Sequence, residues 1–335
     1  MKHSLLLYLF VCANFVLSAQ TVIEVKILNG KEEGRIKIID ISHTVSSESR
    51  YKNTISFNLS KTDLDCYELT YRERNRLFAA TLWLDNGKLK VIAHIAGNSL
   101  VVDTVLGSRI YYVAKRFNTE FMRLKMEKDT TKINRFLCDA IVNNISNPFS
   151  LMAAYKYTDE NSGDIAAGKY LEEILKYQNG KFKWFLYDSL VEERLQLLNS
   201  LKRANLSSIS CFNSKQRITK IKFGDSDYYV IDFWFLHCVP CIKQHKEIRA
   251  AYADLTRSKI KIIGICLDKD SRTIKKYLNK NLFYWDNYFV SNDTDITVRL
   301  KITEFPTYLV TDKHGEILNF CHSFLEIKRQ FCMLP

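Results

Sequence analysis

Residues 230–241 read VIDFWFLHCVPC, and this stretch decides how the C-terminal part of the chain folds. An apolar run over 228–235 is broken only by Asp232, which is typical of a buried strand. Helical spacing follows over 238–256, and a second β-rich run extends over 259–267. The order strand, helix, strand predicts a βαβ unit with the two cysteines of the quoted stretch at the start of its helix.

These two cysteines, Cys238 and Cys241, have the spacing of a redox dithiol. A thiol at a helix N-terminus faces unpaired N–H groups and the positive end of the helix dipole, so its thiolate is favoured. Cys238 is therefore the expected nucleophile, and Cys241, one turn deeper, is expected to resolve the mixed disulfide. The spacing predicts a redox-active disulfide between them.

Two other uses of the cysteine pair stay open. A zinc half-site would need a second pair of ligands, and the remaining His and Cys residues show no second close pair, so no metal is expected. An inert structural disulfide also fits the spacing, although a strand-to-helix corner is an exposed place for one.

Two further positions bear on the chemistry of the pair. Asp232 lies inside an apolar strand six residues before Cys238, where a carboxyl group needs a reason to be buried. We expect it to accept the proton of the resolving cysteine, with a hydrogen-bonded core carboxyl as the alternative. Pro306 opens a later strand and is a candidate for a turn or a cis peptide bond, with an ordinary trans proline as the alternative.

The remaining C-terminal sequence continues the alternation of helices and strands. It predicts a helix over 271–281 with Ser271 as its cap, a short helix over 294–300, and a strand over 307–311 that turns at 313–315. The predicted fold class of this part is therefore α/β.

The N-terminal part has a different pattern. Apolar and charged residues alternate over 21–112, and Asp85-Asn86-Gly87 between two apolar runs is a hairpin signature, which predicts an antiparallel β-rich module. Apolar residues then recur at helical spacing. The expected parts are a β-rich module over 20–113, a helical region over 114–206 and the C-terminal domain over 207–335.

The first residues are typical of a secretory signal peptide. Lys2 and His3 precede a short apolar run over 5–17, and the small residue Ala19 suits a cleavage site. A signal peptide over 1–19 is expected, with an uncleaved anchor as the alternative. No later segment is long and apolar enough to predict a membrane span.

Composition limits the remaining possibilities. The chain has 335 residues, of which 47% are hydrophobic and 26% charged, which predicts about two or three globular domains. The net charge is +12, but Lys and Arg are scattered among acids, so no nucleic-acid partner is expected. The charge leaves open a peripheral association with an anionic membrane. Outside the signal and the close pair, the cysteines are expected to be buried free thiols, with a Cys321–Cys332 pair as the alternative for the last two: Cys66, Cys138, Cys211, Cys266, Cys321 and Cys332.

The C-terminal part, about residues 207–335, resembles the thioredoxin-like proteins of the TlpA and ResA type found in bacterial cell envelopes. The matching residues are Asp232-Phe233-Trp234, Cys238-Val-Pro-Cys241, Ile263-Gly264-Ile265, Leu267-Asp268, Phe305-Pro306-Thr307 and Asp312 through Gly315. The resemblance implies a central mixed sheet flanked by helices and a cis peptide bond before Pro306. It also implies a substrate-binding surface made of Pro306, Phe305, Thr307, Trp234 and His237.

The N-terminal match is looser. A β module that ends at Gly107-Ser108, followed by helices with a Pro148-Phe149-Ser150 step, is similar to the export-directed, two-part thioredoxin proteins common in Bacteroidetes.

Three positions depart from the family pattern. His237 stands where the family usually has Trp; an imidazolium there would favour the Cys238 thiolate, and an exposed His with no partner is the alternative. Gln244 stands where reductase members often carry Glu, and Lys246 stands where Pro is frequent. Proton handling is therefore expected to rest on Asp232 alone.

The resemblance implies an enzyme, a thiol–disulfide oxidoreductase that reduces protein disulfides and takes electrons from an upstream donor in the envelope, with no cofactor. Its expected location is the periplasm or cell envelope of a Gram-negative bacterium. One alternative is an envelope binding or assembly protein with a non-catalytic thioredoxin-like domain. Another is a thiol peroxidase, which would need Thr or Ser three residues before its reactive cysteine, where Phe235 and Cys238 stand instead.

Overall fold

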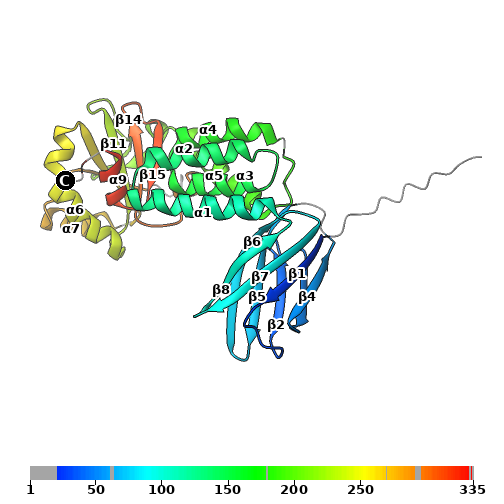
Figure 1. The fold of residues 1–335 in the computed structure, drawn as a ribbon. Coiled ribbons are helices and arrows are strands. Elements are labelled where there is room, and N and C mark those ends of the chain that lie inside the picture. Colours follow the sequence, from blue (N-terminus) through cyan, green and yellow to red (C-terminus); the bar gives the residue numbers. More distant parts are fainter. Residues whose placement is uncertain are drawn as a thin grey trace, which may run out of the picture. The chain divides into compact units, whose positions relative to one another are not determined.

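The computed structural model describes residues 21–60, 64–178, 180–268, 270–290, 296–331 and 333. These residues form two compact units (Figure 1). The first unit contains the described residues up to Asp129 together with Asn147–Phe149, and the second contains Thr130–Ser146 and the described residues from Ser150 onward. The expected signal peptide, 1–19, lies outside the described residues.

The first unit is a β-sandwich with one helix. Its sheets have the strand orders β4-β1-β7-β8 and β3-β2-β5-β6. Alternate side chains of both sheets, such as Ile23 in β1 and Ile38 in β2, meet in one buried core, which confirms the expected strand periodicity. The elements are β1 (Thr21–Ile27), β2 (Arg35–Asp40), β3 (Ser46–Arg50), β4 (Thr54–Leu59), β5 (Asp65–Glu73), β6 (Arg76–Leu84), β7 (Lys88–Ala96), β8 (Ser99–Leu106) and α1 (Arg109–Glu127).

The hairpin predicted at Asp85-Asn86-Gly87 is wrong. β6 pairs with β5 in one sheet, whereas β7 pairs with β1 and β8 in the other, and the β1–β7 pair is parallel. The segment crosses between the sheets because its ends are held by other elements. Val22 N donates to Gly87 O at 2.8 Å, and Ile110 N donates to the Asp85 carboxylate at 2.9 Å.

The helices expected in the middle of the chain are present: α2 (Thr130–Asn143), α3 (Phe149–Glu160), α4 (Ile165–Leu175) and α5 (Leu186–Lys202). They do not form a compact unit of their own. Leu198 and Leu201 of α5 share a buried core with Ile231 and Phe233 of the C-terminal sheet. The expected boundaries at 113/114 and 206/207 therefore differ from the two units, since α1 belongs to the sandwich unit while α2, α4 and α5 belong to the unit of the α/β domain.

The second unit is built on one seven-stranded sheet with the order β10-β9-β13-β12-β11-β14-β15. β11, β12 and β13 are parallel, and β14 and β15 run antiparallel to their neighbours, so the expected mixed sheet is confirmed. The strands are β9 (Ser210–Phe212), β10 (Ile218–Lys220), β11 (Tyr228–Trp234), β12 (Ile260–Cys266), β13 (Asp286–Phe289), β14 (Thr307–Asp312) and β15 (Ile317–Cys321). The helices are α6 (Val239–Arg257), α7 (Ser271–Lys280), α8 (Ile296–Arg299) and α9 (Phe324–Gln330).

β11, α6 and β12 form the predicted βαβ unit. The helix predicted from Ser271 is α7, but its cap is Asp270, whose carboxylate accepts from the backbone N–H groups of Arg272 and Thr273. A carboxylate caps a helix as well as a serine does, and here it stands one residue earlier.

The alternation within β11 positions a carboxylate under α6. Successive side chains of a strand face opposite sides of the sheet. Ile231 and Phe233 lie in the core on the side of α4 and α5, and Val230 and Trp234 lie in the core shared with α6 and α9. Asp232 has the parity of Val230 and Trp234, so its side chain lies on the α6 side.

Candidate functional site

The site centres on the first turn of α6, where Cys238 and Cys241 form a disulfide with a Cα–Cα distance of 5.3 Å. Cys238 is the N-cap of the helix, and its Sγ accepts a hydrogen bond from Cys241 N at 3.2 Å. Cys238 is 4% exposed and Cys241 is 0% exposed, so only Cys238 offers surface to a second molecule. The predicted disulfide is present, and Cys238 is the more exposed of its two cysteines.

The segment before Pro306 lies next to the segment before the disulfide. The ring centroids of Phe305 and Phe235 are 5.5 Å apart and the rings meet edge to face. The Phe305–Pro306 peptide bond is cis, which confirms what the resemblance implied. Thr307 is buried, and its hydroxyl donates to Glu304 O at 2.7 Å, so its side chain is engaged within the loop.

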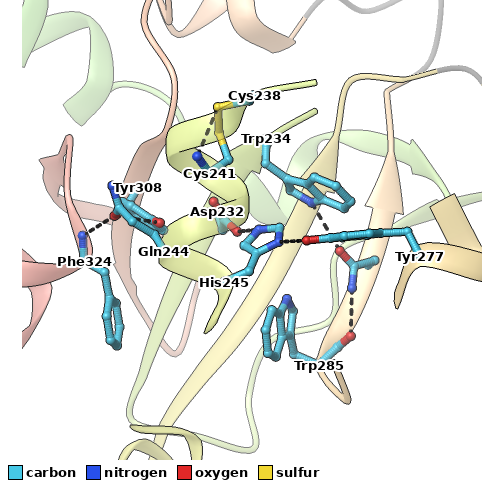
Figure 2. A network of polar contacts seen from close by, with 11 residues as sticks. Asp232, Trp234, Cys238, Cys241, Gln244, His245, Tyr277, Trp285, Tyr308 and Phe324 are labelled. Atoms are coloured by element: carbon cyan, nitrogen blue, oxygen red, sulfur yellow. Dashed lines mark hydrogen bonds and ion pairs between the residues drawn. A yellow bond between two sulfur atoms is a disulfide. The ribbon is translucent and has the colours of Figure 1, made fainter. Parts of the chain in front are cut away.

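Asp232 lies below the disulfide and is fully buried. One of its carboxylate oxygens, Oδ2, is 2.8 Å from Nε2 of His245, which is also fully buried. The other oxygen, Oδ1, has no hydrogen-bond partner among the described residues. The opposite ring nitrogen of His245 is 3.3 Å from the Tyr277 hydroxyl, and Figure 2 shows the three side chains in a row.

The sequence analysis did not single out His245, although its spacing from Cys241 indicates where its side chain lies. It follows Cys241 by four residues, so the two side chains share one face of α6. Helical spacing therefore predicts that His245 faces β11. The spacing does not identify Asp232 as the partner of His245.

Aromatic rings hold the imidazole of His245 in place. The ring centroids of Trp234, Phe283 and Trp285 lie 4.7, 5.4 and 5.8 Å from it, all in edge-to-face orientation. Trp234 is fully buried and donates from Nε1 to Asn287 Oδ1 at 3.3 Å. The expectation that Trp234 contacts substrate is therefore corrected, because its side chain is packed into the core against His245.

Gln244, which stands where reductase members of the family often carry Glu, makes hydrogen bonds to two other elements of the fold. Its amide oxygen accepts from the Tyr308 hydroxyl at 3.1 Å and from Phe324 N at 2.6 Å (Figure 2). Gln244 thereby links α6 to β14 and to the first turn of α9.

His237, next to Cys238, is exposed and makes no hydrogen bond or ion pair with the described residues, which is the alternative expected for it. Asp268, two residues after the end of β12, supports the same loop, since its carboxylate accepts from Leu236 N at 2.5 Å. The sequence reasoning matched Asp268 to the family without assigning this contact.

Five further cysteines within the described ranges carry no disulfide: Cys66, Cys138, Cys211, Cys266 and Cys321. All of them except Cys138 are buried, as expected. Burial raises the pKa of Cys211 to about 11 and that of Cys321 to about 12, so these thiols remain protonated at neutral pH. Cys332 lies outside the described residues.

The described part of the chain contains neither a metal-binding cluster nor a helix that could cross a membrane. No group of three or more His, Cys, Asp or Glu side chains in it is placed to hold a metal ion. None of its helices combines the length and apolar character that a membrane crossing requires.

Comparison with known proteins matches part of the second unit to a family model. A family model described as thioredoxin-like matches residues 225–317, and no match was found among curated proteins. Among solved structures, the thioredoxin domain of a thiol-disulfide oxidoreductase from Bacteroides vulgatus is 20% identical, with 38% of this chain and 95% of that chain covered and a TM-score of 0.34. A thiol:disulfide interchange protein from Bacteroides sp. is 21% identical over 39% of this chain and 90% of that chain, with a TM-score of 0.34. A thiol-disulfide oxidoreductase from Bacteroides fragilis is 18% identical over 39% of this chain and 100% of that chain, also with a TM-score of 0.34. The family match, together with the mixed sheet and the dithiol at the start of α6, identifies the C-terminal part of the chain as a thioredoxin-like domain.

Proposed function

We propose that the protein is an exported thiol–disulfide oxidoreductase that reduces protein disulfides through Cys238 and Cys241. One observation carries this proposal. The disulfide lies at the N-terminus of α6, where Cys238 keeps 4% of its surface exposed and Cys241 keeps none. A substrate disulfide therefore meets Cys238 first, and the helix N-terminus favours the Cys238 thiolate.

The reaction starts from the reduced dithiol. The Cys238 thiolate attacks one sulfur of a substrate disulfide, which releases one substrate thiolate and forms a mixed disulfide with Cys238. Cys241 then loses its proton to Asp232, attacks the Cys238 sulfur and expels the second substrate thiolate. Both substrate thiolates take protons from water. Two electrons have passed to the substrate, and a dithiol donor from the envelope returns Cys238–Cys241 to the reduced form.

Substrate chain is proposed to lie against the loop around Pro306, next to Cys238. The contact between Phe305 and Phe235 brings this loop beside the segment that leads to the dithiol. Exposed His237 and Val239, which is 79% exposed, flank Cys238 and offer further contact surface.

The proposal is tested by insulin-disulfide reduction with dithiothreitol as the electron donor. The unmodified protein is expected to accelerate insulin reduction, and Cys238→Ser is expected to remove the acceleration. Cys138→Ser is the matched control, because it removes a free thiol outside the site and should leave the rate unchanged. Equal rates for Cys238→Ser and the unmodified protein would refute the proposed nucleophile.

A trapping experiment assigns the second cysteine. Cys241→Ser leaves the mixed disulfide unresolved, so this variant is expected to accumulate covalent adducts with substrate proteins on non-reducing gels. Adducts that form equally with Cys238→Ser would contradict the assignment. A dithiol that titrates in redox buffers but neither reduces insulin nor forms adducts would instead favour the binding or assembly protein.

Export is proposed from the signal-like sequence of residues 1–19. Cell fractionation of the Gram-negative host is expected to recover a shortened chain in the periplasmic or envelope fraction. Recovery of the full-length chain in the cytoplasm would refute this part of the proposal. Release of the protein from the membrane fraction by high salt would support a peripheral association with an anionic membrane.

A further inference from the structure

The pairing of Asp232 with a second titratable side chain goes beyond the family resemblance, which left proton handling to Asp232 alone. We propose that His245 is a positioning residue that shares the proton Asp232 takes from Cys241, and that Tyr277 connects this pair to the outside of the core. The inference rests on the proposed function, since it concerns how the mixed disulfide is resolved.

The geometry of the pair is the first support. His245 Nε2 and Asp232 Oδ2 are 2.8 Å apart, and both side chains are fully buried. An isolated buried carboxylate is costly, and a hydrogen-bonded partner that holds a proton at its own nitrogen reduces this cost. The same proton can therefore reside at Oδ2 or at Nε2 without leaving the hydrogen bond.

The free oxygen of Asp232 is the second support. Oδ1 is buried and has no hydrogen-bond partner among the described residues while the dithiol is oxidised. The carboxylate thus keeps one acceptor available on the side that His245 does not occupy. In the reduced protein that acceptor is where the proton from Cys241 would arrive.

The neighbouring titratable groups are the third support. Among the described residues, those whose ionisation Asp232 affects are Cys266 in β12, Tyr277 in α7 and Tyr308 in β14. Burial and the nearby Asp232 carboxylate raise the pKa of Tyr277 to about 12, and the same two causes raise the pKa of Tyr308 well above its ordinary value. Burial is also the largest cause of the raised pKa of Cys266, to which the carboxylates of Asp268 and then Asp232 add. These groups stay protonated near neutral pH, which leaves the pair as the acceptor for the Cys241 proton.

The outer end of the row is Tyr277. Its hydroxyl is 3.3 Å from His245 Nδ1, and its side chain is only half-buried. The proton moves from Cys241 Sγ to the Asp232–His245 pair as the Cys241 thiolate forms and attacks Cys238. After the disulfide closes, the pair returns this proton to water by way of the Tyr277 hydroxyl, which restores the unprotonated pair for the next reaction.

The test separates the two steps of one reaction. The reduced protein is mixed rapidly with dithionitrobenzoate, whose thiolate absorbs visible light. All proteins in this test carry Cys138→Ser, which removes the free thiol of the described residues that is not buried. Attack by Cys238 then releases one aromatic thiolate, and resolution by Cys241 releases the second, so the two phases report the two cysteines. His245→Gln keeps a side-chain donor for Asp232 but removes the imidazole, and Tyr277→Phe removes only the hydroxyl.

In His245→Gln the second phase is expected to slow at least about tenfold at pH 7, since a positioned base contributes about 100-fold or more to proton transfer. Its rate should then rise with pH and approach that of the unmodified protein above about pH 9, where the thiolate forms without a base. The first phase should stay within about twofold. Tyr277→Phe should slow the second phase a few-fold with the same pH dependence.

A merely structural role for His245 gives a different result. The second phase would then be unchanged in His245→Gln, or would slow by the same factor at every pH, and either outcome would overturn the inference. If circular dichroism shows that His245→Gln is unfolded, Tyr277→Phe decides: an unaltered second phase refutes the relay. Absence of any second phase in the unmodified protein would instead refute the proposed function itself.

Discussion

Replacing Leu201 by alanine should destabilise the whole thioredoxin-like unit rather than α5 alone. Leu201 is 2% exposed and belongs to the core that Ile231 and Phe233 of β11 line from the sheet side. A buried Leu→Ala change costs about 2–5 kcal/mol, depending on how far the cavity collapses. The sandwich has a separate core, so its stability should change by less than about 0.5 kcal/mol.

Native-state hydrogen exchange followed by mass spectrometry measures both effects on the full chain. Backbone amides of β11 and β12 exchange when the unit unfolds, and a loss of 2 kcal/mol speeds their exchange about thirtyfold. Peptides from β1 and β5 serve as the internal reference. Leu186→Ala, at a position on α5 that is 39% exposed, is the matched control and should cost less than about 1 kcal/mol.

The exchange rates of the β12 amides show whether the helical region unfolds with the sheet or independently of it. If Leu201→Ala accelerates exchange in α5 but leaves β11 and β12 as slow as before, the helical region is an independent layer. The reasoning from a shared core would then be refuted.

Three further outcomes can be checked. Gly264→Ala should lower the free energy of unfolding by about 1–3 kcal/mol in urea denaturation. The added Cβ would lie 2.1 Å from Asn287 Oδ1, which accepts the hydrogen bond of Trp234. An unchanged urea midpoint would contradict this prediction. Ser108→Ala removes the cap of α1 and should lower the free energy of unfolding, measured by thermal unfolding, by about 1 kcal/mol. Ser108→Thr keeps a capping hydroxyl and should retain most of this stability. Burial raises the pKa of Cys211 from 9.0 to about 11, so its protonated thiol stabilises the fold below about pH 9, and this contribution disappears as the pH rises to about 11. Cys211→Ala should therefore reduce the alkaline loss of stability measured by urea titration, and an identical pH profile would rule this contribution out.

The predictable features were those encoded by local periodicity. The apolar run and the helical spacing of residues 228–256 predicted β11 and α6, and the cysteine spacing predicted the disulfide at their corner. Alternation within β11 even determined the face of Asp232, because a strand has a strict period of two. The same kind of signal predicted the strands of the sandwich but misassigned residues 85–87, since a turn sequence does not say which sheet the next strand joins.

Contacts between distant residues were decided by the tertiary structure. Asp232 and His245 are 13 residues apart, and His245 and Tyr277 are 32 residues apart, on three different elements. The core shared by α5 and β11 is likewise absent from any local pattern. By itself, the sequence determined the dithiol, its helix and the buried carboxylate, because each depends on neighbours along the chain. Only the packing of α6 and α7 over β11 gave that carboxylate a histidine partner, because periodicity specifies which face is buried and not which element covers it.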